Sequence, residues 1–155
     1  MVIDLYVLTS ERSTAVAKQF INNWLVDFNE SASEYEFPQY SVKPTVIFSS
    51  VVELIEKLIA NPNEPHSIYW SNPKQETLRS GMLFFTNDGA MIAGVTLAED
   101  DVLEIAHYLQ ELGKTVGGQF GYTTFEEPPP ETIGEFIDKV KASSPPKLFK
   151  GSLVV

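Results

Sequence analysis

The chain of 155 residues carries a formal net charge of −10, is 43% hydrophobic and 12% aromatic, and contains no cysteine. This composition excludes disorder, disulfides and sulfur-ligated metal sites, and the negative charge opposes direct binding of nucleic acid. No segment reaches the roughly 18 apolar residues of a membrane span, and no secretory leader follows Met1, so we expect one globular, cytoplasmic, bacterial domain over residues 1–155.

The N-terminal segment predicts a strand, a helix and an irregular connection. Residues 2–8 form an apolar run typical of a buried strand. Over residues 11–28 apolar side chains recur at helical spacing, which indicates an amphipathic helix. Residues 29–44 are polar, aromatic and interrupted by proline, so they predict a long loop or an irregular edge strand.

A second strand and a second helix follow. Residues 45–48 predict a short strand. Ser50 and Glu53 form the Ser-x-x-Glu pattern of a capping box before a helix that ends near Ala60. The prolines and asparagines of residues 61–65 oppose both regular structures and therefore predict a connection.

The central segment predicts three strands, two of which are joined as a hairpin. Residues 67–71 form the first strand. Residues 82–85 and 91–97 flank the sequence Asn-Asp-Gly at 87–89. These turn residues tolerate positive φ angles, which a tight hairpin requires, so this is the most strongly indicated pair of strands.

The C-terminal part predicts two helices and a strand. Thr96 and Glu99 form a Thr-x-x-Glu cap before a helix whose apolar face ends at Gly113. A strand over residues 120–125 and a short helix over residues 133–140 follow.

The last residues and the order of the elements complete the prediction of the fold. Residues 143–155 are predicted to form an extended tail, of which residues 153–155 dock as an edge strand. Helices interspersed with strands and one consecutive hairpin favour a mixed sheet over a repeating βαβ array. We therefore predict an α+β fold with a mixed, largely antiparallel sheet and about four helices packed against it.

Acidic residues are concentrated in two intervals. Residues 99–135 carry nine acids against Lys114 alone, whereas residues 138–155 have a balance of +3. Residues 27–36 carry only acids and lie next to aromatic residues, a mixture typical of recognition surfaces with aromatic anchors. The alternative is a solubilising loop with core aromatics. The predicted partner-binding residues are Glu34, Tyr35, Glu36, Tyr40, Glu126 and Glu127.

The sequence contains no catalytic or metal-binding pattern. The tripeptide Gly-Lys-Thr at 113–115 lacks the glycine that a phosphate-binding loop requires at position 108. The two histidines, His66 and His107, share no metal-ligand spacing. Consecutive acids at 99–101 are explained by helix capping. We therefore expect no cofactor, no metal site and no enzyme activity.

A group of short motifs lies between residues 66 and 137. They are Tyr-Trp at 69–70, the run from Met82 to Gly89, Gly94, Gly-Tyr at 121–122 and Glu-Glu-Pro-Pro-Pro at 126–130. Together they resemble the small immunity proteins of bacterial polymorphic toxin systems. The resemblance implies a protein without chemistry of its own that binds and blocks a cognate toxin in the same cell. An acidic face agrees with a basic toxin domain as the partner.

Two other functions remain open. A small enzyme or small-molecule sensor would use a pocket between sheet and helices, where Trp70, His107 and nearby carboxylates would converge. A subunit of a larger assembly would expose an unusually apolar strand or helix face. The leading prediction is an immunity-type inhibitor with a protein partner and no contact with nucleic acid or membrane, in an oligomeric state that the sequence leaves open.

Overall fold

The computed structural model describes residues 1–74 and 76–155. Its elements follow the chain as β1 (Ile3–Leu8), α1 (Thr14–Trp24), β2 (Asn29–Glu30), β3 (Tyr35–Phe37), β4 (Val46–Phe48), α2 (Val51–Ala60), β5 (His66–Ser71), β6 (Leu78–Phe85), β7 (Met91–Leu97), α3 (Val102–Val116), β8 (Phe120–Thr124), α4 (Ile133–Ala142), β9 (Lys147–Phe149) and β10 (Ser152–Val154).

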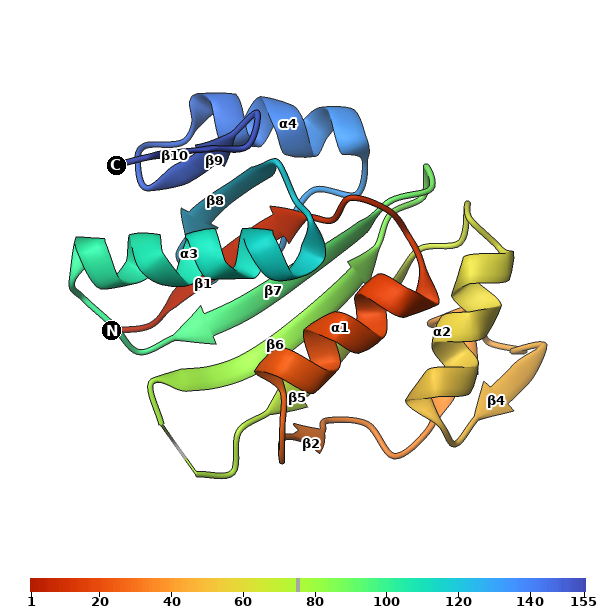
Figure 1. Ribbon diagram of the computed structural model, residues 1–155. Helices are drawn as coiled ribbons and strands as arrows, with labels where there is room; N and C mark the ends of the chain where they lie inside the picture. Colours follow the sequence, from red (N-terminus) through yellow and green to blue (C-terminus); the bar gives the residue numbers. More distant parts are fainter. Residues whose placement is uncertain (75) are drawn as a thin grey trace.

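Eight strands form one sheet in the order β10-β9-β8-β1-β7-β6-β5-β2, and β3 pairs with β4 in a separate ribbon (Figure 1). The predicted α+β class with a largely antiparallel sheet and four helices is confirmed. Every strand pairing within the described residues is antiparallel. The parallel pair of strands expected in a mixed sheet is therefore not found among them.

Strand β1 lies at the centre of the sheet and buries side chains on both faces. It pairs with β7 and β8, and its alternation sends Leu5 to one face and Tyr6 to the other. Helices α1, α2 and α3 cover the first face, whereas α4 packs Phe136 against the second (Figure 1). Because α4 contacts β8 and β9, Tyr69 on β5 stays partly exposed on the second face.

Helix α1 is shorter at both ends than the predicted range 11–28. It starts after Ser13, whose hydroxyl accepts a hydrogen bond from the Val16 N–H at 3.2 Å. It ends at Trp24, and Asp27 takes φ +62, a conformation that no α-helix continues. Among the described residues, no helix combines the length and apolarity needed to cross a membrane.

The two predicted capping boxes are wrong. Ser50 precedes α2, but its side chain makes no capping hydrogen bond. Thr96 does not cap α3 because it lies within β7, where its hydroxyl donates to Asp4 Oδ1 at 2.7 Å. The N-cap of α3 is Asp101, whose carboxylate accepts from the main-chain N–H groups two and three residues later. The acidic run at 99–101 therefore caps this helix, as the sequence indicated.

Helix α3 continues past Gly113, where the sequence predicted its end. Gly113 lies inside the helix, and a side chain there would meet Leu148 of β9. The helix ends at Val116, and Gly117 takes φ +63, the left-handed conformation that favours glycine as a C-cap. Gly113 thus allows close packing of α3 against β9 and does not end the helix. The local sequence does not distinguish these two roles of a glycine.

The predicted hairpin is confirmed as β6–β7. In its turn the Thr86 N–H donates to the Ala90 carbonyl at 3.0 Å, and Gly89 takes φ +95. Strand β6 begins at Leu78 rather than at 82, because its polar first half pairs through the backbone with both neighbouring strands. Gly81 within it is required by packing, since a side chain there would overlap that of Leu25.

Residues 147–154 extend the sheet beyond β8. Strand β9 pairs with β8, and β10 pairs with β9 as a hairpin at the edge of the sheet. Leu148 is buried against α3, which anchors the hairpin. These residues thus form a packed β-hairpin instead of the extended tail that the sequence predicted. The edge strand expected at 153–155 is present as β10.

Arg12 joins three segments that surround the start of α1. Its guanidinium lies 5.0 Å from the ring centroid of Phe85. It donates hydrogen bonds of 2.8 to 3.3 Å to the main-chain carbonyls of Leu58, Asn61, Glu64, Thr86 and Ala90. One cation therefore ties the end of α2 and the connection that follows it to the β6–β7 hairpin.

Candidate functional site

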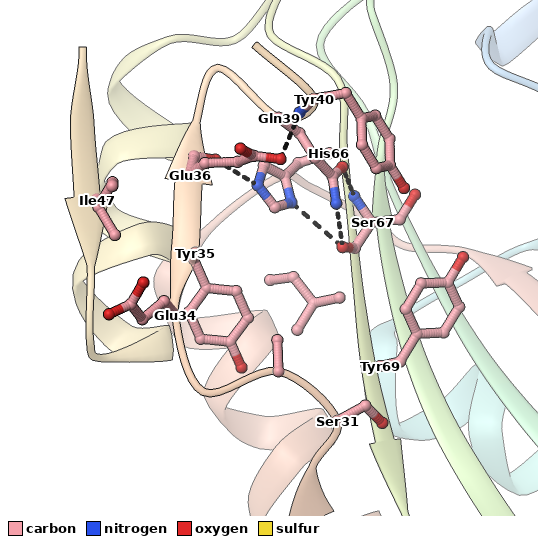
Figure 2. Close-up of a pocket in the computed structure, with 12 residues that line it drawn as sticks. Ser31, Glu34, Tyr35, Glu36, Gln39, Tyr40, Ile47, His66, Ser67 and Tyr69 are labelled. Carbon is pink, nitrogen blue, oxygen red and sulfur yellow. Dashed lines mark hydrogen bonds between the residues drawn. The ribbon is translucent and has the colours of Figure 1, made fainter. Parts of the chain in front are cut away.

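A cavity of about 440 Å³ opens between the β3–β4 ribbon and strand β5. The ribbon contributes Glu34, Glu36 and Ile47, and the opposite side carries Tyr40 and Tyr69 (Figure 2). Strand β3 alternates, so Glu36 faces outward while Tyr35 and Phe37 face the core, and Glu34 directly precedes the strand. The ribbon thus presents its polar face to the cavity and its aromatic face to the interior.

Tyr35 has a different position from the other predicted binding residues. Its side chain is only 5% exposed and belongs to the hydrophobic core. Its hydroxyl donates a 2.6 Å hydrogen bond to Glu30 Oε1, and burial, followed by this carboxylate, raises the pKa of Tyr35. Tyr35 therefore supports the cavity from behind and holds the ribbon on the core.

Tyr40 is the most exposed aromatic residue at the cavity. Its side chain is 80% exposed, and its backbone takes φ +61, a conformation that few non-glycine residues adopt. The Glu36 carboxylate stabilises this conformation by accepting a 2.8 Å hydrogen bond from the Tyr40 N–H. Such backbone strain at an exposed aromatic residue is typical of binding sites.

The loop that carries Tyr40 is fixed to β5 by a side-chain amide. Gln39 Nε2 donates to the Ser67 carbonyl at 3.1 Å, and its Oε1 accepts from the Ser67 N–H at 2.8 Å (Figure 2). The amide thus binds β5 as a neighbouring strand would. His66, buried beside it, places its two ring nitrogens 3.2 Å from the carbonyls of Ser67 and Glu36. Burial lowers the pKa of His66.

A second cavity, of about 300 Å³, continues from the first past Tyr40 and Tyr69. The Tyr69 ring stands edge-on to Phe84 with their centroids 5.8 Å apart. The far wall is formed by residues 128–130, the three prolines, followed by Glu131. We call the two connected cavities the acidic groove. Within the described residues its lining contains no Lys or Arg, and its carboxylates are Glu34, Glu36, Glu64 and Glu131.

Glu126 and Glu127 lie outside the acidic groove. Both are exposed and precede the proline wall. The Glu127 carboxylate lies 3.4 Å from Lys139 Nζ and accepts a hydrogen bond from Thr124 at 3.2 Å. The six residues chosen from the sequence therefore divide into Glu34, Glu36 and Tyr40 at the groove, Tyr35 behind it, and this acidic pair beyond one end.

Tyr69 and the prolines at 128–130 were not among the predicted site residues. The alternation in β5 contained the signal for Tyr69, because it lies between Ile68 and Trp70, which both face the core. Nothing in the local sequence places the prolines opposite residue 69, since that proximity depends on the order of the strands.

The pocket suggested for an enzyme or sensor does not form from Trp70 and His107. Trp70 is buried in the core, whereas His107 is exposed on α3 beside Tyr108. A different cavity, of about 710 Å³, lies where α3, β1, β8 and the end of α4 meet, and we call it the apolar hollow. Two of its charged side chains are engaged: Glu99 accepts from main-chain N–H groups, and Lys139 pairs with Glu127.

Within residues 1–74 and 76–155, no three His, Asp or Glu side chains are placed to hold a metal ion. The half-buried Asp4 accepts a hydrogen bond from the Thr96 hydroxyl, and burial raises the pKa of its carboxyl. The groove therefore offers carboxylates and tyrosines for recognition.

No family model matches the sequence, and no curated protein matches it significantly. The structure is similar to a chain of the crystal structure of the toxic C-terminal tip of CdiA from Pseudomonas aeruginosa in complex with immune protein. The match covers 81% of this chain and 88% of the other, at 16% identity and a TM-score of 0.45.

Proposed function

We propose that this protein is a cytoplasmic immunity-type inhibitor that binds a basic toxin domain through the acidic groove and catalyses no reaction. The observation that carries this proposal is a groove with four carboxylates, two exposed tyrosines and no cation among its described lining residues. Tyrosines are frequent binding hot spots, and carboxylates around them attract a basic partner and fix its register.

The charge beyond the groove supports the same partner. Glu126 adds an exposed carboxylate past the proline wall, where Glu127 pairs with Lys139, and the whole chain carries a net charge of −10. A field of this sign accelerates association with a basic surface, and salt weakens the acceleration. We therefore expect the association rate to fall more steeply with salt than the dissociation rate rises.

The proposal requires a toxin gene beside the gene of this protein, and the test is protection when a toxin domain found there is co-expressed with this protein in a laboratory bacterium. Wild-type protein is expected to restore growth. Glu34→Lys places a cation in the groove and is expected to weaken binding about tenfold and to reduce protection. Binding of the purified proteins is measured by calorimetry at low and high salt.

The matched control is Asp138→Lys, which makes the same charge change on the exposed side of α4. It is expected to keep protection and affinity nearly unchanged. Toxicity that the wild-type protein does not relieve, or equal effects of both reversals, would contradict the proposal. Unfolding curves of both variants establish that neither result reflects loss of the fold.

The apolar hollow supports a second candidate, a small-molecule binding protein. Its size lies within the range of about 300 to 1,000 Å³ usual for ligand pockets, and Ile3, Ile105 and the exposed Phe125 contribute apolar surface. Native mass spectrometry of the protein purified from its own bacterium tests this alternative. A retained small molecule, together with no toxin binding, would favour it over inhibition.

A further inference from the structure

The cavity between the β3–β4 ribbon and β5 is shaped to accept one side chain, and we call it the socket. Glu36 lies on the outward face of β3 opposite Ile47 in the ribbon register, and Glu34, which directly precedes the strand, also lines the cavity. Tyr40 and Tyr69 form the facing side (Figure 2). A side chain that enters between them meets carboxylates on one side and phenol rings on the other.

The two carboxylates retain capacity to bind a cation. Glu34 makes no hydrogen bond or ion pair with any described residue. Glu36 uses Oε1 for the Tyr40 N–H, whereas a carboxylate has about four acceptor positions. No Lys or Arg of the described chain lines this cavity, so its negative charge is uncompensated there. The complementary occupant is a cationic side chain from outside.

The aromatic side of the socket distinguishes between the two cationic residues. A guanidinium is flat and weakly hydrated, stacks on aromatic rings and binds carboxylates through two parallel hydrogen bonds. An ammonium is compact and strongly hydrated, so it gains less from a phenol ring. We propose that this cavity binds an arginine side chain of the partner protein. The identity of that partner rests on the proposed function, but the selectivity for arginine does not.

The test uses capped tetra-arginine and capped tetra-lysine peptides as probes, which carry equal charge. Both are titrated into the full-length protein, and backbone amide shifts are followed by NMR. Tetra-arginine is expected to bind about threefold or more tightly than tetra-lysine. Its largest shifts are expected at residues 31–40 and 66–69. Equal affinity of the two peptides, or shifts elsewhere, would overturn the proposal.

Two variants remove one side of the socket each. Glu34→Gln deletes a charge, and Tyr40→Asn deletes the ring while keeping a residue that tolerates φ above zero. Each is expected to weaken tetra-arginine binding about fivefold, and Tyr40→Asn is expected to reduce the preference over tetra-lysine. Asp138→Asn is the control for lost charge and is expected to change neither affinity.

The outcomes separate this inference from toxin inhibition. Selective arginine binding without protection in the co-expression assay would support the socket and contradict the inhibitor function. Protection that is lost in Glu34→Lys, combined with equal binding of both peptides, would support the inhibitor function and contradict the socket.

Discussion

At the scale of single residues, Arg12 shows how much structure one cation organises through main-chain carbonyls. Its guanidinium donates to carbonyls of five residues drawn from α2, the connection to β5 and the β6–β7 turn. A planar guanidinium has five N–H donors in a fixed fork, whereas an ammonium has three. Burial lowers the pKa of Arg12, but an arginine with so high a reference pKa stays charged.

Arg12→Lys is therefore expected to lower the free energy of unfolding by about 2 to 4 kcal/mol, because main-chain carbonyls lose a charged donor. Urea unfolding measures the change. Lys18→Met, which removes an exposed cation from α1, is the comparison and is expected to change the same quantity by less than about 0.5 kcal/mol. Similar losses in both variants would show that the Arg12 hydrogen bonds add little.

At the scale of elements, the connection from α3 to β8 requires a residue without a side chain at Gly118. A Cβ atom at Gly118 would overlap Val7 of β1 and would lie 2.6 Å from the Leu8 carbonyl oxygen. A backbone atom cannot move aside as a side-chain tip can, so the sheet itself would have to shift. By contrast, a Cβ atom at Gly134 in the first turn of α4 would meet nothing within 4 Å.

These two glycines give opposite expectations for the same substitution. Gly118→Ala is expected to lower the free energy of unfolding by about 1 to 3 kcal/mol through overpacking. Gly134→Ala is expected to raise it by about 0.5 to 1 kcal/mol, because alanine favours the helix. Thermal and urea unfolding of both variants check the signs. If both substitutions lowered the free energy of unfolding by the same amount, the difference in packing between the two glycines would be refuted.

The elements that the sequence predicted correctly are those with their own apolar periodicity. Strand β1, helix α2 and the β6–β7 hairpin were all recognisable locally. The pairing of strand β3 and the role of Thr96 were not recognisable locally, because both depend on contacts with distant segments. Residues 35–37 become a strand only by pairing with β4, and Thr96 is unavailable as a cap because β1 engages it.

At the scale of the whole molecule, the site was only partly predictable. Acids beside aromatics in residues 27–40 indicated Glu34, Glu36 and Tyr40, which do share one cavity. Composition cannot tell an outward from an inward aromatic, so Tyr35 was grouped with them although it is buried. The place of residues 126–130 relative to β5 depends on strand order, and this order follows from the complete fold.

His66 is buried where the β3–β4 ribbon packs on the sheet. This burial makes the free energy of unfolding of the whole molecule depend on pH. The pKa of His66 lies below the ordinary value because burial outweighs the opposing hydrogen bonds to the Glu36 and Ser67 carbonyls and the charges of Glu64 and Glu36. As pH falls below about 6.5, the unfolded chain takes up a proton that the folded protein does not. The contribution of His66 to stability is therefore present at neutral pH and lost on acidification.

The expected result is a loss of unfolding free energy between about pH 7.5 and pH 5.5 that is smaller in His66→Gln than in the wild type. Urea unfolding at both pH values measures it. Asp4, whose raised pKa acts in the opposite direction, is present in both proteins and cancels in the comparison. An equal pH dependence of the two proteins would show that folding does not lower the pKa of His66.

The side-chain amide of Gln39 also bears on self-association. Strand β2 pairs with β5 only at Ser71 and Trp70, and the Ser31 N–H binds the Tyr69 carbonyl, so the rest of that edge depends on Gln39. An open strand edge is a template for pairing with another copy and for aggregation. Gln39 occupies both backbone groups of Ser67, so a second molecule cannot pair a strand with β5 at this position. The groove can therefore lie next to a sheet edge without promoting self-association through that edge.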